Sequence, residues 1–298
     1  MTIEIFKSIS EITENYQNKL KNKNVSKTTF LSGFDGLDVI TNGFQQSNLV
    51  IIGGADGMGK TSFAISLIHK MAVEKQYSVL FYSFQRSSQQ ILQSILSIET
   101  KIGIKKLQSE TLDDVESELA FQKIRLLEPR NLQISDYPFK TVSDIEREMS
   151  YRPPDTLQIL VIDSLHQIAL NKNDKIGKVL NKKECTEIAF RLKEIAEQYN
   201  IVVIAILNIE KNKNSQPYYR PRLSDMTKQA PADSVADIVL LLYRPEYYKL
   251  STWDDDEDHP TAGEAEIIIA KNNNGYLDNI RIKFDRETLL FDNFSAGS

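Results

Sequence analysis

A glycine-rich loop between an apolar strand and a helix is the feature that most constrains the fold of this chain. Residues 54–61, Gly-Ala-Asp-Gly-Met-Gly-Lys-Thr, fit the pattern G-x-x-x-x-G-K-[ST]. They follow an apolar run, Leu49 to Ile52, and precede residues 62–73, where apolar residues recur at helical spacing. This order lets backbone N–H groups and the helix N-terminus face phosphate oxygens. The stretch therefore predicts a nucleotide site within an α/β fold.

Two elements assign roles at this site. Lys60 is expected to reach the β- and γ-phosphates, and the Thr61 hydroxyl is expected to ligate Mg²⁺. The strand "LQILVIDSL" (157–165) contains Asp163 at its end, and a charge beside a buried strand is costly unless it is paired or binds a metal. We expect Asp163 to hold Mg²⁺ through water, so the predicted ligands are ATP and Mg²⁺. The predicted nucleotide contacts are Gly54, Ala55, Asp56, Gly57, Met58, Gly59, Lys60, Thr61 and Ser62.

The composition limits the class of protein. The chain has 298 residues with 36 basic and 41 acidic side chains, which give a net charge of −5. This balance argues against a uniformly cationic nucleic-acid binder and leaves room for a local basic strip. Cys185 is the single cysteine, which excludes a disulfide framework and fits a reducing compartment. No apolar run reaches membrane-spanning length and residues 1–24 lack a signal-peptide core, so we expect a cytoplasmic protein without a membrane partner.

Hydrophobic patterning divides the chain into three parts. Apolar residues at three- and four-residue steps over 2–21 predict an amphipathic helix, which with a polar linker makes up residues 1–29. Residues 30–294 alternate apolar runs with helical patterns, which predicts a mainly parallel twisted sheet with helices on both faces. The remaining runs of this sheet are Val79–Phe84, Leu157–Ile162, Ile201–Ile206 and Ile238–Tyr243. Residues 295–298 are expected to be a frayed tail.

Two further features lie in the last third of the domain. The apolar runs Ala265–Ala270 and Asn279–Phe284 are joined by a segment that contains Asn274-Gly275. Such a pair is typical of a hairpin and predicts an antiparallel edge to the sheet. The acidic stretch "WDDDEDHP" (253–260) has residue types that bind metals, but we expect a solvated loop there.

From about Phe30 to Phe294 the chain resembles the ATPase domain of the DnaB-type replicative helicases, which has a RecA-like fold. The matching stretches are "SGFDGLDVITNGFQQSNLVIIGG", "VLFYSFQRSSQQI", "LVIDSLHQI", "RPRLSDMTKQAPADSVADIVLLLYRPEYY" and "IIIAKNNNG". The resemblance implies binding of ATP, Mg²⁺ and single-stranded DNA. Residues 2–21 resemble the family's linker helix, which docks on the neighbouring subunit of a ring, so a homo-oligomer or a helicase-ring partner is implied. We expect no counterpart of the family's separate N-terminal domain.

The chain departs from the family at positions that the resemblance assigns to catalysis. Gln85 replaces a glutamate that activates the attacking water, and an amide cannot accept a proton. Asn208 replaces a glutamine that senses the γ-phosphate. Lys271 matches a lysine that reaches the neighbouring subunit, while Asn273 replaces an arginine finger and is neutral. Because Lys60 and Asp163 are retained, the site is predicted to bind ATP and to hydrolyse it weakly or not at all.

The segment that faces DNA in the family differs as well. Thr227, Lys228, Gln229 and Ala230 stand where the family has arginine, glutamate, serine and glycine. A second strip, residues 171–183, is rich in lysine and faces DNA in the family, although such a strip is usually a solvated surface. The nucleic-acid contacts predicted from both segments are Lys178, Lys182, Lys183, Lys228 and Ala230.

These observations favour a degenerate DnaB-like protein that binds Mg·ATP and single-stranded DNA, with weak or lost hydrolysis. One alternative is an active helicase in which another carboxylate, Asp233 or Glu210, activates the water. Another is a non-catalytic partner or loader that uses residues 2–21 to dock on a true helicase ring.

Overall fold

The computed structural model describes residues 9, 10, 13, 17, 28–128, 131–138, 140–170, 174, 180–210, 220–254 and 256–294. Most of the helix predicted over residues 2–21 lies outside the described residues, as does the tail predicted over 295–298. The four described residues of the first segment, Ile9, Ser10, Thr13 and Gln17, have helical conformation.

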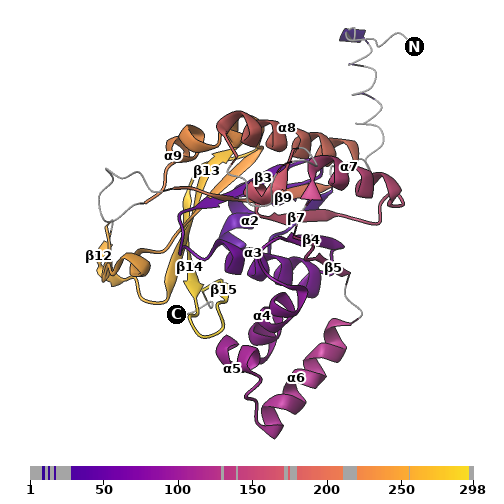
Figure 1. Cartoon of the computed structure of the whole chain (residues 1–298). Helices are drawn as coiled ribbons and strands as arrows, with labels where there is room; N and C mark the ends of the chain where they lie inside the picture. Colours follow the sequence, from indigo (N-terminus) through magenta and orange to yellow (C-terminus); the bar gives the residue numbers. More distant parts are fainter. Residues whose placement is uncertain are drawn as a thin grey trace.

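Within the described residues, nine strands form one central sheet in the order β15-β14-β13-β10-β3-β9-β7-β4-β5 (Figure 1). The parallel strands are β3 (Leu49–Gly54), β4 (Val79–Ser83), β5 (Leu132–Ser135), β7 (Ile159–Asp163), β9 (Val202–Asn208) and β10 (Ile238–Tyr243). The antiparallel strands are β13 (Glu264–Asn272), β14 (Asn279–Phe284) and β15 (Phe291–Asp292). The mainly parallel sheet with an antiparallel edge hairpin is therefore confirmed, and β15 extends that edge.

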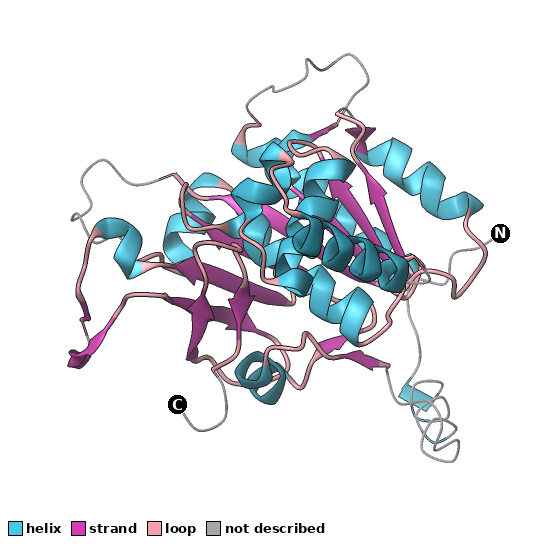
Figure 2. Ribbon diagram, turned by 90° about the horizontal axis from the view of Figure 1, so that it is seen from below, coloured by secondary structure: helices cyan, strands magenta, loops and turns pink. Residues whose placement is uncertain are grey.

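Helices cover both faces of the sheet, as the connections between parallel strands require (Figure 2). Val50 and Ile52 of β3 pack on the side of α3 (Lys60–Ile68) and α4 (Ser88–Thr100). Leu49 and Ile51 pack on the side of α7 (Val142–Tyr151) and α8 (Lys182–Gln198). Because successive side chains of a strand point to opposite faces, a continuous apolar run serves both cores.

Smaller elements connect this framework. α5 (Ile104–Ser109) and α6 (Asp114–Leu127) continue from α4 away from the sheet and share a small apolar cluster with it (Figure 1). The other helical elements are α2 (Asp35–Thr41), η1 (His69–Glu74), η2 (Leu165–Gln167), α9 (Leu223–Gln229), η3 (Ala232–Ser234) and η4 (Pro245–Tyr248). The remaining strands pair as β1 (Thr29–Phe30) with β2 (Phe44–Gln45), β6 (Lys140–Thr141) with β8 (Ile168–Ala169), and β11 (Thr252–Trp253) with β12 (Asp256–Pro260).

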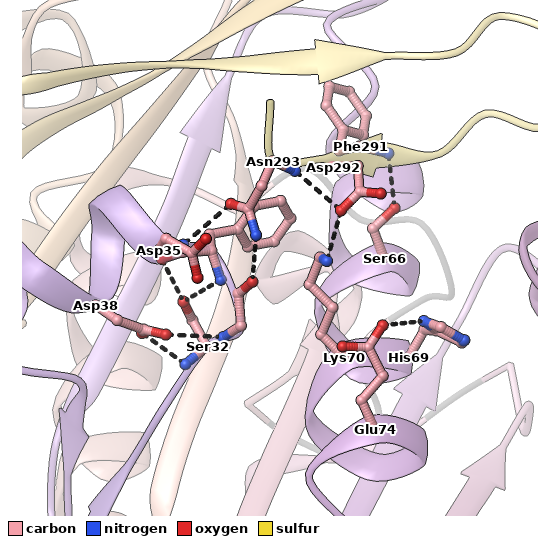
Figure 3. A network of polar contacts seen from close by, with 12 residues as sticks. Ser32, Asp35, Asp38, Ser66, His69, Lys70, Glu74, Phe291, Asp292 and Asn293 are labelled. Atoms are coloured by element: carbon pink, nitrogen blue, oxygen red, sulfur yellow. Dashed lines mark hydrogen bonds and ion pairs between the residues drawn. The ribbon is translucent and has the colours of Figure 1, made fainter. Parts of the chain in front are cut away.

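A polar network fastens the edge strand β15 to the start of the domain (Figure 3). Lys70 is buried, and its Nζ lies 2.7 Å from Asp292 Oδ1. Ser66 Oγ accepts a hydrogen bond from the Phe291 N–H at 3.0 Å, and Asn293 Nδ2 donates to Gly33 O at 2.9 Å. These contacts join the last strand to α3, η1 and the segment before α2, which closes the core beneath the antiparallel edge.

The expectation of a wholly solvated loop over 253–260 is wrong. β11 and β12 pair there as a short hairpin, and Trp253 is buried. Its indole Nε1 donates to Glu264 Oε2 at 2.9 Å, while His259 Nε2 lies 2.9 Å from Glu264 Oε1. The large apolar ring of Trp253 supplies the burial that an acidic loop alone lacks. Among the described helices, none has the length and apolar character needed to cross a membrane.

Candidate nucleotide site

The predicted loop lies between β3 and α3 and has a backbone that suits phosphate binding. Gly57 and Gly59 have φ values of +82° and +85°, in the left-handed region that glycine enters without steric cost. A Cβ atom added at Gly57 would lie 2.1 Å from Cζ of Tyr247, so a side chain there would require this ring to move. α3 begins at Lys60 directly after Gly59, which has no side chain to cap the first N–H groups. The loop and the first turn of α3 therefore offer backbone donors to a phosphate.

Lys60 is folded back across this loop. Its Nζ donates to Ala55 O at 2.9 Å and to Asn208 Oδ1 at 2.8 Å, and it lies 3.8 Å from Asp56 Oδ1. Burial lowers the pKa of Lys60, and the nearby carboxylate of Asp56 opposes that shift. The register of β3 with β9 sets Gly54 opposite Asn208, which explains why the amide lies beside the ammonium group. The structure thus brings together two of the predicted phosphate-facing residues.

Asp163 is 5% exposed at the end of β7. Burial raises the pKa of this carboxyl, and a hydrogen bond from the Thr61 hydroxyl and the charges of Arg86 and Lys60 limit the rise. A hydroxyl and a single carboxylate form the kind of partial oxygen set that Mg²⁺ completes with waters and phosphates. The described residues contain no cluster of three or more His, Cys, Asp or Glu side chains that could hold a metal. The donor set therefore fits Mg²⁺ that arrives with a nucleotide.

Gln85 is the second residue beyond β4, whose last residue pairs with Asp163. β4 pairs with β7 so that Ser83 is opposite Asp163, and the Phe84 N–H donates to Asp163 O at 3.1 Å. Gln85 is exposed at this position. Its amide can orient a water molecule by hydrogen bonding, but it cannot take the proton of that water.

Lys271 and Asn273 lie at the other ends of the strands. Asn273 is exposed, and its backbone N–H donates to Asp237 O at 3.0 Å. Asp237 Oδ2 accepts from the N–H of Leu49, the first residue of β3, at 2.8 Å. Lys60 follows the opposite end of β3, so roughly 16 Å of strand separates it from this group. Within one chain the structure does not bring Lys271 or Asn273 to the phosphate loop.

The two carboxylates considered as substitutes for a catalytic glutamate lie in different places. Asp233 O accepts from Lys271 Nζ at 2.8 Å, and Asp233 Oδ2 accepts from Thr227 Oγ1 at 2.9 Å. Asp233 therefore lies with Lys271, away from the loop. Glu210 is exposed, and its backbone N–H donates to Gln229 Oε1 at 2.6 Å.

The predicted nucleic-acid contacts have mixed outcomes. Lys228 is exposed on α9, and Lys182 and Lys183 are exposed in the first turn of α8. The side chain of Ala230 is fully buried in the core beneath α8, so any contact of this residue with nucleic acid would be through its backbone and stays a prediction. Lys178 lies outside the described residues.

Two arginines at the site were missed by sequence reasoning. Arg86 lies near Asp163, as its effect on that carboxyl shows. Arg244 lies behind the loop, where its Nη2 lies 2.9 Å from Glu246 Oε1 and its N–H donates to Met58 Sδ at 3.3 Å. Each arginine follows a buried strand by at most a few residues, and a cation in that position was the signal available in the sequence.

Comparisons with known proteins agree with this geometry. The profile of the family described as "DnaB-like helicase C terminal domain" matches residues 30–293. The chain is 31% identical over 264 residues to a probable replicative DNA helicase of Trieres chinensis, covering 88% of this chain and 56% of that protein. It is 30% identical over 292 residues to the replicative DNA helicase DnaB of Geobacillus stearothermophilus, covering 97% and 62%. The chain thus spans somewhat over half the length of these relatives.

Solved structures support the fold. One solved ATPase domain matches with a TM-score of 0.80 at 24% identity, over 97% of this chain and 100% of that chain. A DnaB-like replicative helicase, solved to study its interactions with primase, matches with a TM-score of 0.79 at 23% identity, over 97% of this chain and 68% of that one. The fold is that of a RecA-like ATPase domain.

Proposed function

Because the chain belongs to the family of DnaB-like helicase C-terminal domains, we propose that it binds ATP with Mg²⁺ at the loop between β3 and α3. The proposal rests on the convergence of Lys60, Asn208 and Asp163 beside three neighbouring strands, β3, β9 and β7. The backbone of residues 54–62 would hold the phosphates, and Thr61 and Asp163 would hold Mg²⁺. When bound, the metal supplies charge that stabilises the leaving phosphoryl group.

We also propose that the site holds ATP and hydrolyses it slowly. Gln85 follows β4, whose last residue pairs with Asp163, and as an amide it would not accept the proton of an attacking water. Asn273 is neutral, so it brings no charge to a neighbouring subunit. Loss of an arginine finger lowers hydrolysis by about 10³-fold or more. The two deficits together support nucleotide as a structural or switching ligand.

Single-stranded DNA is the proposed second ligand. Its proposed phosphate contacts are Lys178, Lys182, Lys183 and Lys228. The start of α8 lies near the end of β9, since Cys185 Sγ is 3.9 Å from His166 Nδ1 and His166 Nε2 is 3.1 Å from Asn208 O. Gln229, next to Lys228, is bound to Glu210, two residues beyond Asn208. Lys182, Lys183 and Lys228 thus border the segment after β9, which would couple DNA binding to the nucleotide.

Association with further subunits is the last part of the proposal. Lys271 and Asn273 are distant from the loop of their own chain, which suits residues that would act on a neighbouring subunit. Residues 2–21 would dock on that neighbour. The neighbour is a second copy of this chain or, if the chain is a partner or loader, a subunit of a related helicase ring.

A thermal unfolding experiment tests nucleotide binding. Millimolar Mg·ATP should raise Tm, because a ligand of the folded state stabilises it by RT ln(1 + [L]/Kd). Lys60→Ala should remove most of the shift, and Lys123→Ala, a change on α6 away from the loop, should leave it intact. No shift for the wild type, or an equal shift for Lys60→Ala, would refute the proposal.

Steady-state hydrolysis with and without single-stranded DNA tests turnover. The unmodified chain should hydrolyse ATP far more slowly than the roughly 1–10² s⁻¹ of ordinary enzymes. Gln85→Glu should give a modest gain, since the base acts within one subunit. Adding Asn273→Arg should raise the rate further only if subunits meet as in a ring. Ordinary rates for the wild type would instead favour an active helicase with a different base.

A further inference from the structure

Arg86 is held by the end of β4 next to the nucleotide site. Ser83 Oγ donates to Arg86 O at 2.8 Å and accepts from the Arg86 N–H at 3.2 Å, which closes a tight turn around Gln85. The same Ser83 is opposite Asp163 in the register of β4 with β7, and the Phe84 N–H donates to Asp163 O. The backbone of Arg86 is therefore fixed to the end of β4, which pairs with Asp163 at the end of β7.

The side chain of Arg86 brings a positive charge to this carboxylate. Arg86 is half-buried, and its charge acts on Asp163 together with that of Lys60. Burial lowers the pKa of Arg86, and the negative charge of Asp163 opposes that shift. Within the described residues the guanidinium forms no hydrogen bond or ion pair, although Asp163 is near. Its N–H donors are therefore available to an anion with several oxygen atoms.

The order of the strands places Arg86 on the far side of Asp163 from the loop. Lys60 follows β3, Asn208 ends β9, Asp163 ends β7, and Arg86 follows β4, and these strands are neighbours in that order. A phosphate chain that begins at the loop and is held by Lys60 would extend along this row. Its last phosphate would meet the group that lies beyond Asp163.

We propose that Arg86 binds the terminal phosphate of ATP from within the same chain and so stabilises the bound nucleotide. This inference rests on the proposed nucleotide site. A guanidinium can form two parallel hydrogen bonds with a phosphate, which an ammonium cannot match. Because ADP lacks the terminal phosphate, Arg86 would bind ATP but not ADP in this way. The site would therefore prefer ATP over ADP.

Calorimetric titration with Mg·AMP-PNP and Mg·ADP tests the inference, since it measures binding without turnover. Arg86→Gln should raise the Kd for Mg·AMP-PNP by about 10- to 100-fold, the range for a hydrogen bond to a charged group. The Kd for Mg·ADP should stay within about twofold of wild type. Arg86→Lys should lie between wild type and Arg86→Gln. Arg125→Gln, at an exposed position on α6, should change neither Kd.

The outcomes separate this inference from the proposed function. Equal losses for both nucleotides, or no loss for either, would show that Arg86 serves only as a partner of Asp163 and would overturn the inference. Absence of binding by the wild-type chain would instead overturn the nucleotide site itself, and the inference with it. Arg86→Lys, which keeps charge and length, provides the same comparison if Arg86→Gln fails to fold.

Discussion

Glu246 is expected to stabilise the domain through the buried arginine behind the phosphate loop. Its Oε1 lies 2.9 Å from Arg244 Nη2 and 3.0 Å from Arg286 Nε, and its Oε2 accepts from the Gly263 N–H at 2.8 Å. Arg244 also lies over the Phe284 ring, 3.6 Å from its centroid. Glu246→Gln keeps the shape of this side chain, but it removes the charge and replaces one acceptor oxygen with a donor.

The size of the effect follows from the burial of each partner. The side chain of Glu246 is 5% exposed and that of Arg244 is 11% exposed, so this pair is nearly dry. Removal of one partner of a buried pair costs about 3–5 kcal/mol, and the residual exposure places this case near the lower end, at about 3 kcal/mol. A domain of this size loses about 2–4 °C per kcal/mol, which gives a fall in Tm of roughly 6–12 °C. Arg286 is 67% exposed, so Arg286→Gln should leave Tm close to that of the wild type.

Thermal unfolding monitored by circular dichroism measures both variants, and its pH dependence checks the cause. Although burial alone would raise the pKa of Glu246, hydrogen bonds from Arg286, the Gly263 N–H and Arg244 lower it below the usual 4.5. The contribution of this carboxylate is therefore complete above about pH 4.5 and is lost as the pH falls through the lowered pKa. The difference in Tm between the wild type and Glu246→Gln should become smaller in acid. An equal loss for Arg286→Gln, or a gap that widens in acid, would refute the reasoning.

Three further outcomes are expected. Asp163→Asn should leave the nucleotide-free protein no less stable at pH 7, because burial raises the pKa of Asp163 and disfavours its ionised form. In the same variant, the rise in Tm caused by ATP should no longer depend on Mg²⁺. Replacement of both Lys182 and Lys228 by alanine should weaken binding of single-stranded DNA, measured by fluorescence anisotropy, and reduce the slope of log K against log salt by about 0.7 for each lysine that binds a phosphate; an unchanged slope would exclude both lysines from the interface. Deletion of residues 1–24 should reduce the number of subunits in the assembly, as measured by light scattering. A monomer both before and after the deletion would show that these residues do not mediate assembly.

The sequence alone determined the local elements of this protein. Alternating apolar runs predicted five of the six parallel strands, all but β5, and the observed bounds of these five agree with the predicted ones to within about two residues. The glycine loop, with Lys60 and Thr61, could be assigned because strand, turn and helix are adjacent in the chain. The resemblance to the family added Gln85, Asn208, Lys271 and Asn273, which also lie next to recognisable strands. The strand predictions succeed because their physical causes act between near neighbours.

The tertiary structure alone decided which distant side chains meet. Arg86 lies beside Asp163 because β4 and β7 are adjacent in the sheet, and no local pattern states that adjacency. Arg244 and Glu246 lie behind the loop because β10, which they follow, is adjacent to β3 in the sheet. Ala230 is buried because α8 and the sheet enclose it. Burial and pairing depend on the packing of several elements at once, and residues distant in sequence supply the atoms that exclude water. Hydrophobic period and motif spacing describe one segment at a time, so they cannot contain this information.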